Sequence, residues 1–312
     1  MRLLITGGLG YLGGRLAQYF EKQSNYDIVL GSRNPIDKPL WLTKASIVET
    51  KWESTNELQK ICNGVNTIIH LAGMNAQDCF SDPLAALEFN TVATARLLKV
   101  AVQEGVSRFI YFSTAHVYGS PLKGIISEKT VPKSLHPYAT SHRAAEDIVR
   151  SAHQRAEIQG IVIRLSNSYG APAQKDANCW MLLINDLCRQ AVMTKKLVLR
   201  SSGLQRRDFV PIADVCSATD YLIKLKNFEH NIFNIGGNWA PTVLDVSLLI
   251  QERCLAILGF RPDIIRKPQS SDEQTDDLDY RTDLLKNSGF ILSSDKVHEI
   301  DELLLFCKIN FP

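Results

Sequence analysis

The sequence has no excess of charge of either sign. Its 312 residues include 35 Lys and Arg against 33 Asp and Glu, which gives a formal net charge of +2, and there is no long basic run. A protein that binds nucleic acid or an anionic membrane through its surface charge usually carries a basic patch or a large net charge. The composition therefore argues against nucleic acid and membranes as partners and favours a small molecule.

Long hydrophobic runs are also missing. No apolar stretch approaches the roughly 20 residues that a membrane-spanning helix needs. The first residues, MRLLITGG, already have the pattern of a strand and a turn, which leaves no room for a signal peptide. With 45% hydrophobic and 22% charged residues the chain can bury a full core. We therefore expect a soluble globular protein of the cytoplasm.

Metal-ligand spacing is absent as well. The cysteines form no CxxC pair and have no histidine at ligand spacing. They are Cys62, Cys79, Cys179, Cys188, Cys216, Cys254 and Cys307. We interpret them as reduced core residues and predict no metal site.

The first half of the sequence alternates between strand-like and helix-like stretches. Short apolar runs are typical of buried strands, and the amphipathic stretches between them are typical of helices. The expected strands are Arg2–Thr6, Asp27–Leu30, Thr67–Leu71, Arg108–Ser113 and Gly160–Leu165, and helical patterns begin near Leu12, Pro83 and Pro137. This alternation predicts an α/β protein with a doubly wound parallel sheet of the Rossmann type.

The rhythm becomes irregular after Ser166, which indicates a second, smaller domain. We expect residues 1–165 to form the dinucleotide-binding domain. Residues 208–240, with a strand at Asn231–Ile235, should return to it. Residues 166–207 and 241–312 should form a C-terminal substrate-binding domain.

A glycine-rich turn follows the first expected strand, in the segment TGGLGYLGGRL. Glycines at a strand-to-helix turn let the backbone approach a pyrophosphate, which is then bound by the free N–H groups of the helix N-terminus. Glycines also mark ordinary turns, but this position between a strand and a helix favours a dinucleotide site. The expected cofactor contacts here are Gly7, Gly10, Tyr11, Leu12 and Gly13.

The end of the second expected strand, in DIVLGSRNP, bears on the choice of cofactor. A carboxylate at this point would favour NAD, whereas an arginine would favour the 2′-phosphate of NADP. Gly31 occupies the place of the carboxylate, and Ser32 and Arg33 follow it. We therefore predict that Ser32 and Arg33 contact the cofactor and that NADP is preferred over NAD. The alternative is that Arg33 is only a surface cation in a turn.

Several further motifs occur in a fixed order from Met1 to about Leu244. They are TGGLGYLG, LAG (Leu71–Gly73), NTVAT (Asn90–Thr94), STAHVYG, YATSH with Glu146 after it, RLSNSYG and RRDFVPIADV. Together they resemble the extended short-chain dehydrogenase/reductases, in particular the NAD-dependent epimerase/dehydratase family that acts on nucleotide sugars. The resemblance covers most of the chain, and it is more specific for the fold than for the reaction.

The resemblance implies a catalytic role for two residues. Thr114 matches the Ser/Thr that hydrogen-bonds the reacting oxygen, and Tyr138 matches the acid/base tyrosine. A hydride moving between a sugar carbon and a nicotinamide requires a proton to move at the neighbouring oxygen, and a phenol can carry that proton. The alternative for Tyr138 is a surface tyrosine near the start of a helix.

Other residues are implied in binding. The family pattern places Leu71, Ala72 and Gly73 at the cofactor, and His116, Asn167 and Arg207 at the substrate, the last two near the nucleotide diphosphate. Asn167 could instead be a turn residue. Arg207 could instead form a structural ion pair with Asp208 or Asp214.

The sequence departs from the family at the catalytic lysine, which is replaced by His142. His142 lies four residues after Tyr138, so on a helix the two side chains share one face. We expect both to contact the cofactor and to act as a weakened catalytic pair. A histidine of ordinary pKa is only about a quarter protonated at pH 7. Glu146, one turn further along, would favour the imidazolium if it approached closely.

A second departure concerns the family's dehydratases, which carry acidic residues directly after the Ser/Thr. Here Ala115 and His116 follow Thr114. We therefore expect an NAD(P)-dependent reductase or epimerase of a nucleoside-diphosphate sugar, with a 4-keto-6-deoxy sugar as the expected substrate by analogy. One alternative is a catalytically impaired dinucleotide-binding protein, a sensor or inactive subunit. Another is a reductase of a non-sugar carbonyl compound. The resemblance also suggests a homodimer, although no feature of the sequence proves one.

Overall fold

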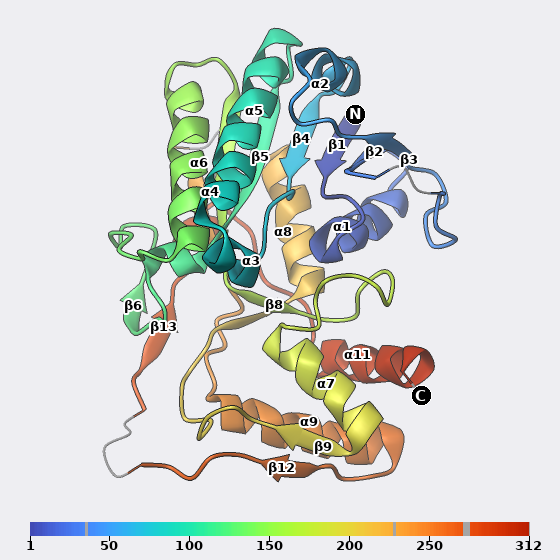
Figure 1. Ribbon diagram of the computed structural model, residues 1–312, viewed down its shortest axis with the longest axis vertical. Helices are drawn as coiled ribbons and strands as arrows, with labels where there is room; N and C mark the ends of the chain where they lie inside the picture. The colour runs from blue at the N-terminus through green and yellow to red at the C-terminus, as the bar shows by residue number, and fades with distance from the viewer. Residues whose placement is uncertain (35–36, 227–228, 271–274, 312) are drawn as a thin grey trace. The chain divides into compact units, whose positions relative to one another are not determined.

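The computed structural model describes residues 1–34, 37–226, 229–270 and 275–311 (Figure 1). The chain forms two compact units. Unit 1 consists of Met1–Ser120, Val131–Leu165 and Thr219–Phe233, and unit 2 of Pro121–Thr130, Ser166–Ala218 and Asn234–Pro312. Compared with the expected boundaries, residues 121–130 group with unit 2, and the segment that returns to unit 1 is shorter than 208–240.

Unit 1 is built around a parallel sheet. Its strands are β1 (Arg2–Thr6), β2 (Asp27–Ser32), β3 (Ser46–Glu49), β4 (Thr67–His70), β5 (Arg108–Thr114), β7 (Gln159–Leu165) and β11 (Ile232–Ile235), whose last two residues group with unit 2. In the described residues they form a seven-stranded sheet of order β11-β7-β5-β4-β1-β2-β3, and each neighbouring pair from β7 to β3 is parallel. This order confirms the predicted Rossmann-type fold.

The central strands formed close to where the sequence predicted them because each contains a short apolar run, such as Leu3–Ile5 in β1 and Ile68–Ile69 in β4. Every residue of β4 and β5 is buried, as is usual for parallel strands with helices on both faces. The edge strand β3 was not predicted, since it has only four residues and none of them is fully buried. The chain order reverses between β1 and β4, which is where doubly wound folds bind ligands, at the carboxyl ends of the strands.

The helices of unit 1 connect these strands. They are α1 (Tyr11–Glu21), α2 (Thr55–Cys62), α3 (Ala76–Ser81), α4 (Pro83–Ala86), the π-helical turn η1 (Leu87–Val92), α5 (Ala93–Gln103), the 3₁₀ turn η2 (Ala115–Tyr118) and α6 (Pro137–Gln154). The apolar stripes of α2, α5 and α6 form one buried core with the sheet, around residues such as Leu97, Val149 and Phe109. Helix α6 begins at Pro137, as predicted, because proline suits the first helical position and the His136 side chain accepts a hydrogen bond from Tyr138 N–H.

Unit 2 combines short strand pairs with helices. Its elements are β6 (Gly124–Ile126), β8 (Asn167–Tyr169), α7 (Leu183–Thr194), β9 (Lys196–Val198), β10 (Phe209–Pro211), α9 (Val243–Leu258), β12 (Asp263–Ile265), β13 (Leu278–Tyr280), α10 (Asp283–Asn287) and α11 (Lys296–Asn310). Helix α8 (Ile212–Lys224) begins in unit 2 and ends in unit 1. The strands pair as β8 with β10, β9 with β12 and β6 with β13. Apolar residues of α7, α9 and α11 form the core of this unit.

Candidate active site

The glycine-rich turn lies at the carboxyl end of β1 and leads into α1. Gly7 has φ +65°, and an added Cβ there would lie 3.0 Å from the backbone N of Ala72. A Cβ on Gly13 would collide with the backbone of Gly7 and Gly8. The N-cap of α1 is Gly10, which offers no side-chain oxygen to the first turn of the helix. The turn therefore has the close backbone packing and the uncapped helix N-terminus that a pyrophosphate site requires.

A row of polar side chains crosses the sheet next to this turn. Thr6, His70 and Tyr111 are in register on the adjacent strands β1, β4 and β5. Thr6 Oγ1 lies 2.6 Å from His70 Nδ1, and His70 Nε2 lies 2.8 Å from Thr94 Oγ1. Thr6 Oγ1 also accepts hydrogen bonds from the N–H groups of Leu71 and Ala72. Through these bonds the buried row holds the loop that contains LAG.

The buried His70 is neutral. Burial lowers its pKa to about 3, and the nearby His142 adds a smaller effect in the same direction. The Thr94 hydroxyl donates its hydrogen to the carbonyl of Asn90. Toward His70 it can therefore act only as an acceptor, so the Nε2 atom of His70 carries the hydrogen. His70 is therefore a structural polar residue, and the sequence analysis missed it because a histidine in an apolar strand carries no local signal of its partners.

His142 and Tyr138 do lie side by side on α6, as their spacing predicted. Their ring centroids are 4.6 Å apart in an edge-to-face arrangement. His142 is buried, and its Nδ1 lies 2.7 Å from the Tyr111 hydroxyl of β5. Burial, with a smaller contribution from His116, lowers the pKa of His142 to about 4. The structure thus corrects the sequence expectation: the imidazole is neutral at pH 7, with no appreciable protonated fraction.

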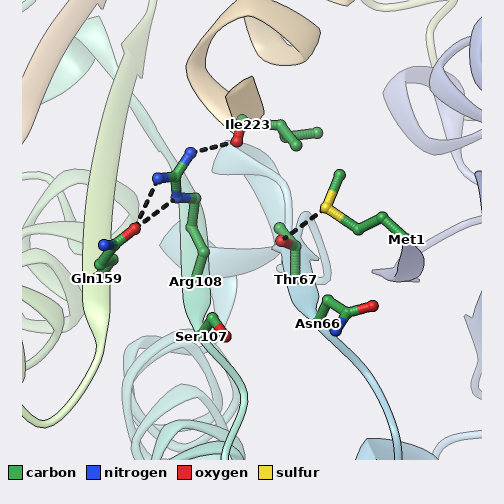
Figure 2. Close-up of a pocket in the computed structure, with 7 residues that line it drawn as sticks. All are labelled: Met1, Asn66, Thr67, Ser107, Arg108, Gln159 and Ile223. Carbon is green, nitrogen blue, oxygen red and sulfur yellow. Dashed lines mark hydrogen bonds between the residues drawn. The ribbon is translucent and has the colours of Figure 1, made fainter. Parts of the chain in front are cut away.

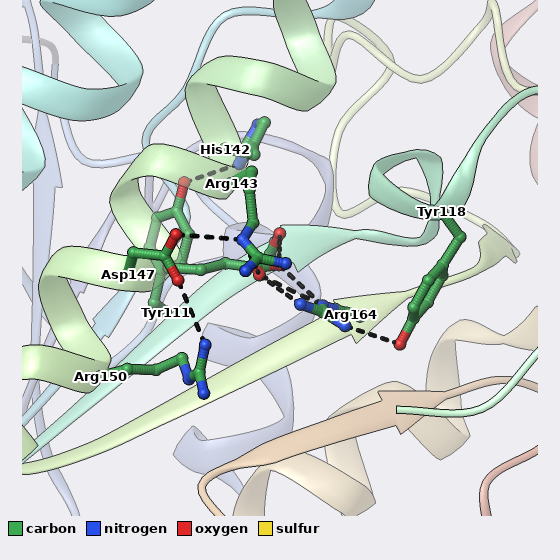
Figure 3. A network of polar contacts seen from close by, with 9 residues as sticks. Tyr111, Tyr118, His142, Arg143, Asp147, Arg150 and Arg164 are labelled. Carbon is green, nitrogen blue, oxygen red and sulfur yellow. Dashed lines mark hydrogen bonds and ion pairs between the residues drawn. The ribbon is translucent and has the colours of Figure 1, made fainter. Parts of the chain in front are cut away.

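Glu146 does not bind His142, because a buried arginine takes its carboxylate. Arg164 of β7 lies 2.6 Å from Glu146 Oε2, and Ser113 donates to Oε1 at 2.5 Å. Figure 3 shows Arg164 reaching the Tyr118 hydroxyl on its other side, at 2.9 Å. Burial alone would lower the pKa of Arg164, but its bonds to Glu146 raise it above the usual value. The guanidinium and carboxylate therefore form a buried ion pair, and the partly exposed Arg143 lies at the longer distance of 3.9 Å from Glu146 Oε2.

Strand β5 and helix α6 contact each other through a matched ladder. Tyr111 and Ser113 are two apart on the strand and so point to the same side of it, while His142 and Glu146 are four apart on one helix face. The first rung joins Tyr111 to His142 and the second joins Ser113 to Glu146. Figure 3 shows the first rung, with the Tyr111 hydroxyl directed at the ring of His142. This ladder fixes α6, and with it Tyr138, against the end of β5.

Thr114 is the last residue of β5 and lies beside Tyr138. The Thr114 hydroxyl lies near enough to the Tyr138 phenol to act on its pKa, and Thr114 Oγ1 accepts a hydrogen bond from the N–H of His116 at 3.1 Å. Burial raises the pKa of Tyr138, and the Thr114 hydroxyl acts in the opposite direction without cancelling this effect. The His116 ring is exposed and meets Tyr138 edge to face, with centroids 6.0 Å apart. Three of the predicted residues, Thr114, Tyr138 and His116, are thus brought together.

The residues predicted to choose the cofactor lie at the end of β2. Ser32 donates to the carbonyl of Asn34 at 2.9 Å, and the exposed Arg33 guanidinium carbon lies 5.5 Å from the centroid of the Phe89 ring. A Cβ on Gly31 would lie 2.7 Å from Thr50 Oγ1. Thr50 therefore occupies the space that a carboxylate at position 31 would need.

Asn167 and Arg207 lie in unit 2, where the pairing of β8 with β10 brings their neighbourhoods together. Asn167 pairs with Phe209 in register, and its side chain donates to the carbonyl of Asp208 at 2.9 Å. Arg207 is half-buried, and burial lowers the pKa of its guanidinium. The Asp208 carboxylate accepts from Ser166, Gly237 and Trp239. Asp214 likewise binds Ser293 and Ser294, so within the described residues Arg207 pairs with neither aspartate.

A pocket of about 430 Å³ lies at the opposite, amino-terminal edge of the unit 1 sheet (Figure 2). Its lining residues are Met1, Asn66, Thr67, Ser107, Arg108, Gln159 and Ile223. The Arg108 guanidinium donates to Gln159 Oε1 at 2.6 Å and to the carbonyls of Leu222 and Ile223 at the end of α8. Arg108 thus satisfies the carbonyls of a helix C-terminus, and this pocket lies away from the glycine turn and Tyr138.

The remaining expectations concern metal sites, the cysteines and membrane-spanning helices. Across the described ranges, no group of three or more His, Cys, Asp or Glu side chains is arranged to hold a metal ion. All seven cysteines are buried. In the same part of the chain, no helix combines the length and the apolar character that crossing a membrane would require.

Comparisons with known proteins extend this description. A family model described as the NAD dependent epimerase/dehydratase family matches residues 3–236. The chain is similar to the dTDP-D-glucose 4,6-dehydratase of Mus musculus, with 28% identity over 316 residues that cover 96% of this chain and 83% of the relative.

Solved structures with a similar fold include the enzyme TunA, described as an NAD dependent NDP-hexosamine 5,6-dehydratase involved in tunicamycin biosynthesis. Its TM-score is 0.80 at 26% identity, over 98% of this chain and 97% of that chain. MoeE5, solved with UDP-glucose and NAD, has a TM-score of 0.81 at 22% identity over 100% of both chains, a likeness that shows the fold alone.

Proposed function

The chain belongs to the NAD-dependent epimerase/dehydratase family, and from this premise we propose that it is an NAD(P)-dependent reductase or epimerase of a nucleoside-diphosphate sugar. The observation that carries the proposal is the contact of Thr114, Tyr138 and His142 at the carboxyl end of β5. His142 stands close to the loop that contains LAG, and this loop packs on the glycine turn. Both features suit a dinucleotide with its reacting end near Tyr138.

A bound nicotinamide dinucleotide would donate or accept the hydride. In the direction of reduction, Tyr138 gives its phenolic proton to the oxygen of the sugar carbonyl, while Thr114 orients that oxygen. Because burial raises the pKa of Tyr138 and the neighbouring His142 is neutral, the phenol keeps its proton at neutral pH. A group that starts protonated serves as an acid, so the proposal favours reduction of a keto sugar, such as a 4-keto-6-deoxy sugar, over oxidation of a hydroxyl.

The half-buried Arg207 and the adjacent Asn167 support a diphosphate as part of the substrate. An arginine can bind phosphate oxygens through two parallel hydrogen bonds. A cation that is partly removed from water and has no carboxylate partner gains most from such an anion. We propose that these two residues hold the diphosphate of the nucleotide sugar.

Transfer of deuterium tests the proposed function directly. The purified protein would be incubated with NADPH or NADH deuterated at the nicotinamide C4, together with 4-keto-6-deoxy sugars linked to UDP, dTDP, GDP or CDP. Mass spectrometry should find deuterium on the sugar carbon of one of these substrates. If dinucleotide binds but none of these sugars gains deuterium and none of the corresponding nucleoside-diphosphate hexoses is epimerised, the alternative of a binding protein replaces the enzyme. Transfer that free nucleoside diphosphates do not inhibit would instead indicate a non-sugar substrate.

Cofactor choice gives a first mutational prediction. Because Thr50 fills the carboxylate position and the exposed Arg33 makes no ion pair among the described residues, we propose that Arg33 binds the 2′-phosphate of NADP. Arg33→Ala should weaken NADP(H) binding by about tenfold to 100-fold, as expected for loss of a charge-assisted hydrogen bond. NAD(H) affinity should change little. Calorimetry with both dinucleotides measures this, with Arg155→Ala as an exposed control, and equal losses for both cofactors would refute the assignment.

A second prediction concerns dehydration, the reaction of several relatives. Dehydration requires an acid for the leaving hydroxyl and a base for a carbon-bound proton. Here the residues after Thr114 are the buried Ala115 and the exposed His116, and the nearby Glu146 is bound by Arg164. We expect no 4,6-dehydration of UDP-, GDP- or dTDP-hexoses with NAD or NADP. A keto product lighter by one water in mass spectrometry would contradict this expectation.

A further inference from the structure

The two nitrogens of His142 have different surroundings. Nδ1 lies 2.7 Å from the Tyr111 hydroxyl, whereas Nε2 has no hydrogen-bond partner in the described ranges. The Nε2 edge of the ring faces the loop after β4, because a Cβ built on Gly73 would lie 3.7 Å from Cε1 and 3.8 Å from Nε2. The loop thus lies along the Cε1–Nε2 side of the imidazole, whereas Tyr111 binds Nδ1.

The direction of the Tyr111 bond follows from what else that hydroxyl can do. Tyr111 is 2% exposed, and among the described residues its hydroxyl binds only His142. If the phenol accepted from Nδ1–H, its own O–H would be buried without an acceptor, which is costly. If the phenol donates, its O–H has an acceptor and the lone pair of His142 Nδ1 has a donor. Burial raises the pKa of Tyr111 well above its usual value, so the hydroxyl keeps the proton that it must donate.

We propose that Tyr111 is a positioning residue that fixes His142 as the Nε2–H tautomer, so that this N–H donates to a ribose hydroxyl of the dinucleotide next to Gly73. A neutral imidazole has one N–H, and the bond made by one nitrogen determines which nitrogen carries it. His142 then serves as a neutral, directed donor rather than as a cation. The tautomer stands on geometry alone, while the ribose contact rests on the proposed function.

The tautomer can be tested on the protein without any ligand. Two-dimensional ¹H–¹⁵N spectra of ¹⁵N-histidine-labelled protein distinguish the protonated from the unprotonated ring nitrogen, and His142→Gln identifies the resonances by removing them. At pH 7 we expect His142 to be fully Nε2–H, and Tyr111→Phe to produce a mixture of tautomers. An Nδ1–H ring in the wild type, or a tautomer unchanged by Tyr111→Phe, would overturn the role of Tyr111. Tyr280→Phe is the control, since it removes another buried hydroxyl, bound to Asn234.

The donor role can be tested by a matched pair of substitutions. Glutamine places an amide N–H near the position of Nε2, whereas asparagine places its polar atoms near Nδ1 only. Calorimetry should find that His142→Gln keeps dinucleotide affinity, whereas His142→Asn weakens it by roughly threefold to tenfold, the effect of one neutral hydrogen bond. Tyr111→Phe should weaken binding in proportion to the lost fraction of competent tautomer.

The outcomes separate this inference from the proposed function. If the wild type binds dinucleotide but His142→Asn binds equally well, the donor role is wrong while the function stands. If the wild type binds no dinucleotide, the proposed function and the ribose contact both fail. The spectra of His142 then still decide whether Tyr111 fixes the tautomer.

Discussion

Tyr138→Phe should lower kcat by at least about 100-fold, because general acid catalysis typically contributes 10²–10⁴-fold. The substitution removes one oxygen from a residue that is only half-buried, and it leaves the contact of the ring with His142 intact. Dinucleotide affinity should therefore change little. Stopped-flow measurement of hydride transfer at saturating substrate gives kcat, and calorimetry gives the affinity. Thr114→Val is the companion variant, since it removes the hydroxyl that lowers the pKa of Tyr138.

The same measurements should also be made in a second background, the His142→Lys variant. A cation about 4 Å from the phenol at an effective dielectric constant of 20 would favour the phenolate by roughly 4 kcal/mol, or about three pKa units. The native imidazole, with a pKa of about 4, supplies no such charge at any pH above 6. The pKa of Tyr138, raised by burial, should therefore fall towards neutrality, where an acid/base group is most effective. Turnover at pH 8 should rise by roughly tenfold if part of that shift reaches the transition state.

Tyr138→Phe should remain inactive in both backgrounds. Between pH 6 and 8, the wild-type rate of reduction should also show no inflection from His142, because its pKa lies below that range. If His142→Lys gains nothing and Tyr138→Phe loses nothing, Tyr138 and His142 are only neighbours on a helix. The interpretation as a dinucleotide-binding protein without turnover would then replace the enzyme.

Glu146→Gln should reduce the free energy of unfolding by about 3–5 kcal/mol, the usual cost of removing one partner of a buried ion pair. Glu146 and Arg164 are 0% and 1% exposed, and both carboxylate oxygens accept hydrogen bonds from the guanidinium. Glutamine has nearly the same shape, but it has no charge and turns one of these acceptors into a donor. The Arg164 guanidinium would then be buried without a counterion. Urea unfolding with matched m-values measures the difference.

Asp147→Asn is the matched control, one residue further along the same helix. Asp147 also forms ion pairs, with Arg143 at 3.1 Å and Arg150 at 3.2 Å, but 51% of its side chain is exposed. Pairs at the surface contribute less than about 1 kcal/mol. A Glu146→Gln variant as stable as Asp147→Asn would show that the buried pair carries no special cost.

If Glu146→Gln does not fold, the double variant Glu146→Met with Arg164→Met still tests the argument. Replacing both members of a buried pair by apolar side chains removes the unpaired charge and is often neutral or stabilising. The double variant should therefore fold and be more stable than Glu146→Gln. A double variant no more stable than the single one would mean that the network stabilises the fold in some way other than charge pairing.

Local patterns in the sequence were enough to predict the frame of unit 1. β1 spans Arg2–Thr6 and α6 begins at Pro137, both as predicted, because strand burial and helix starts depend on residues close together in the chain. The family was also predictable, since its motifs are short and occur in order. Weak elements such as the edge strand β3 were not predicted, because four partly exposed residues give no clear periodicity.

The sequence by itself also determined that Tyr138 and His142 share a helix face, because side chains four residues apart on a helix are neighbours. It could not determine the charge of His142. Glu146 could have favoured the imidazolium. In the tertiary structure, however, Glu146 forms an ion pair with Arg164, and His142 forms a hydrogen bond with Tyr111. Those partners come from β7 and β5, and the burial that lowers the pKa of His142 comes from the packing of whole elements. Protonation depends on which groups meet in space and on how much water they exclude, and only the folded chain sets either.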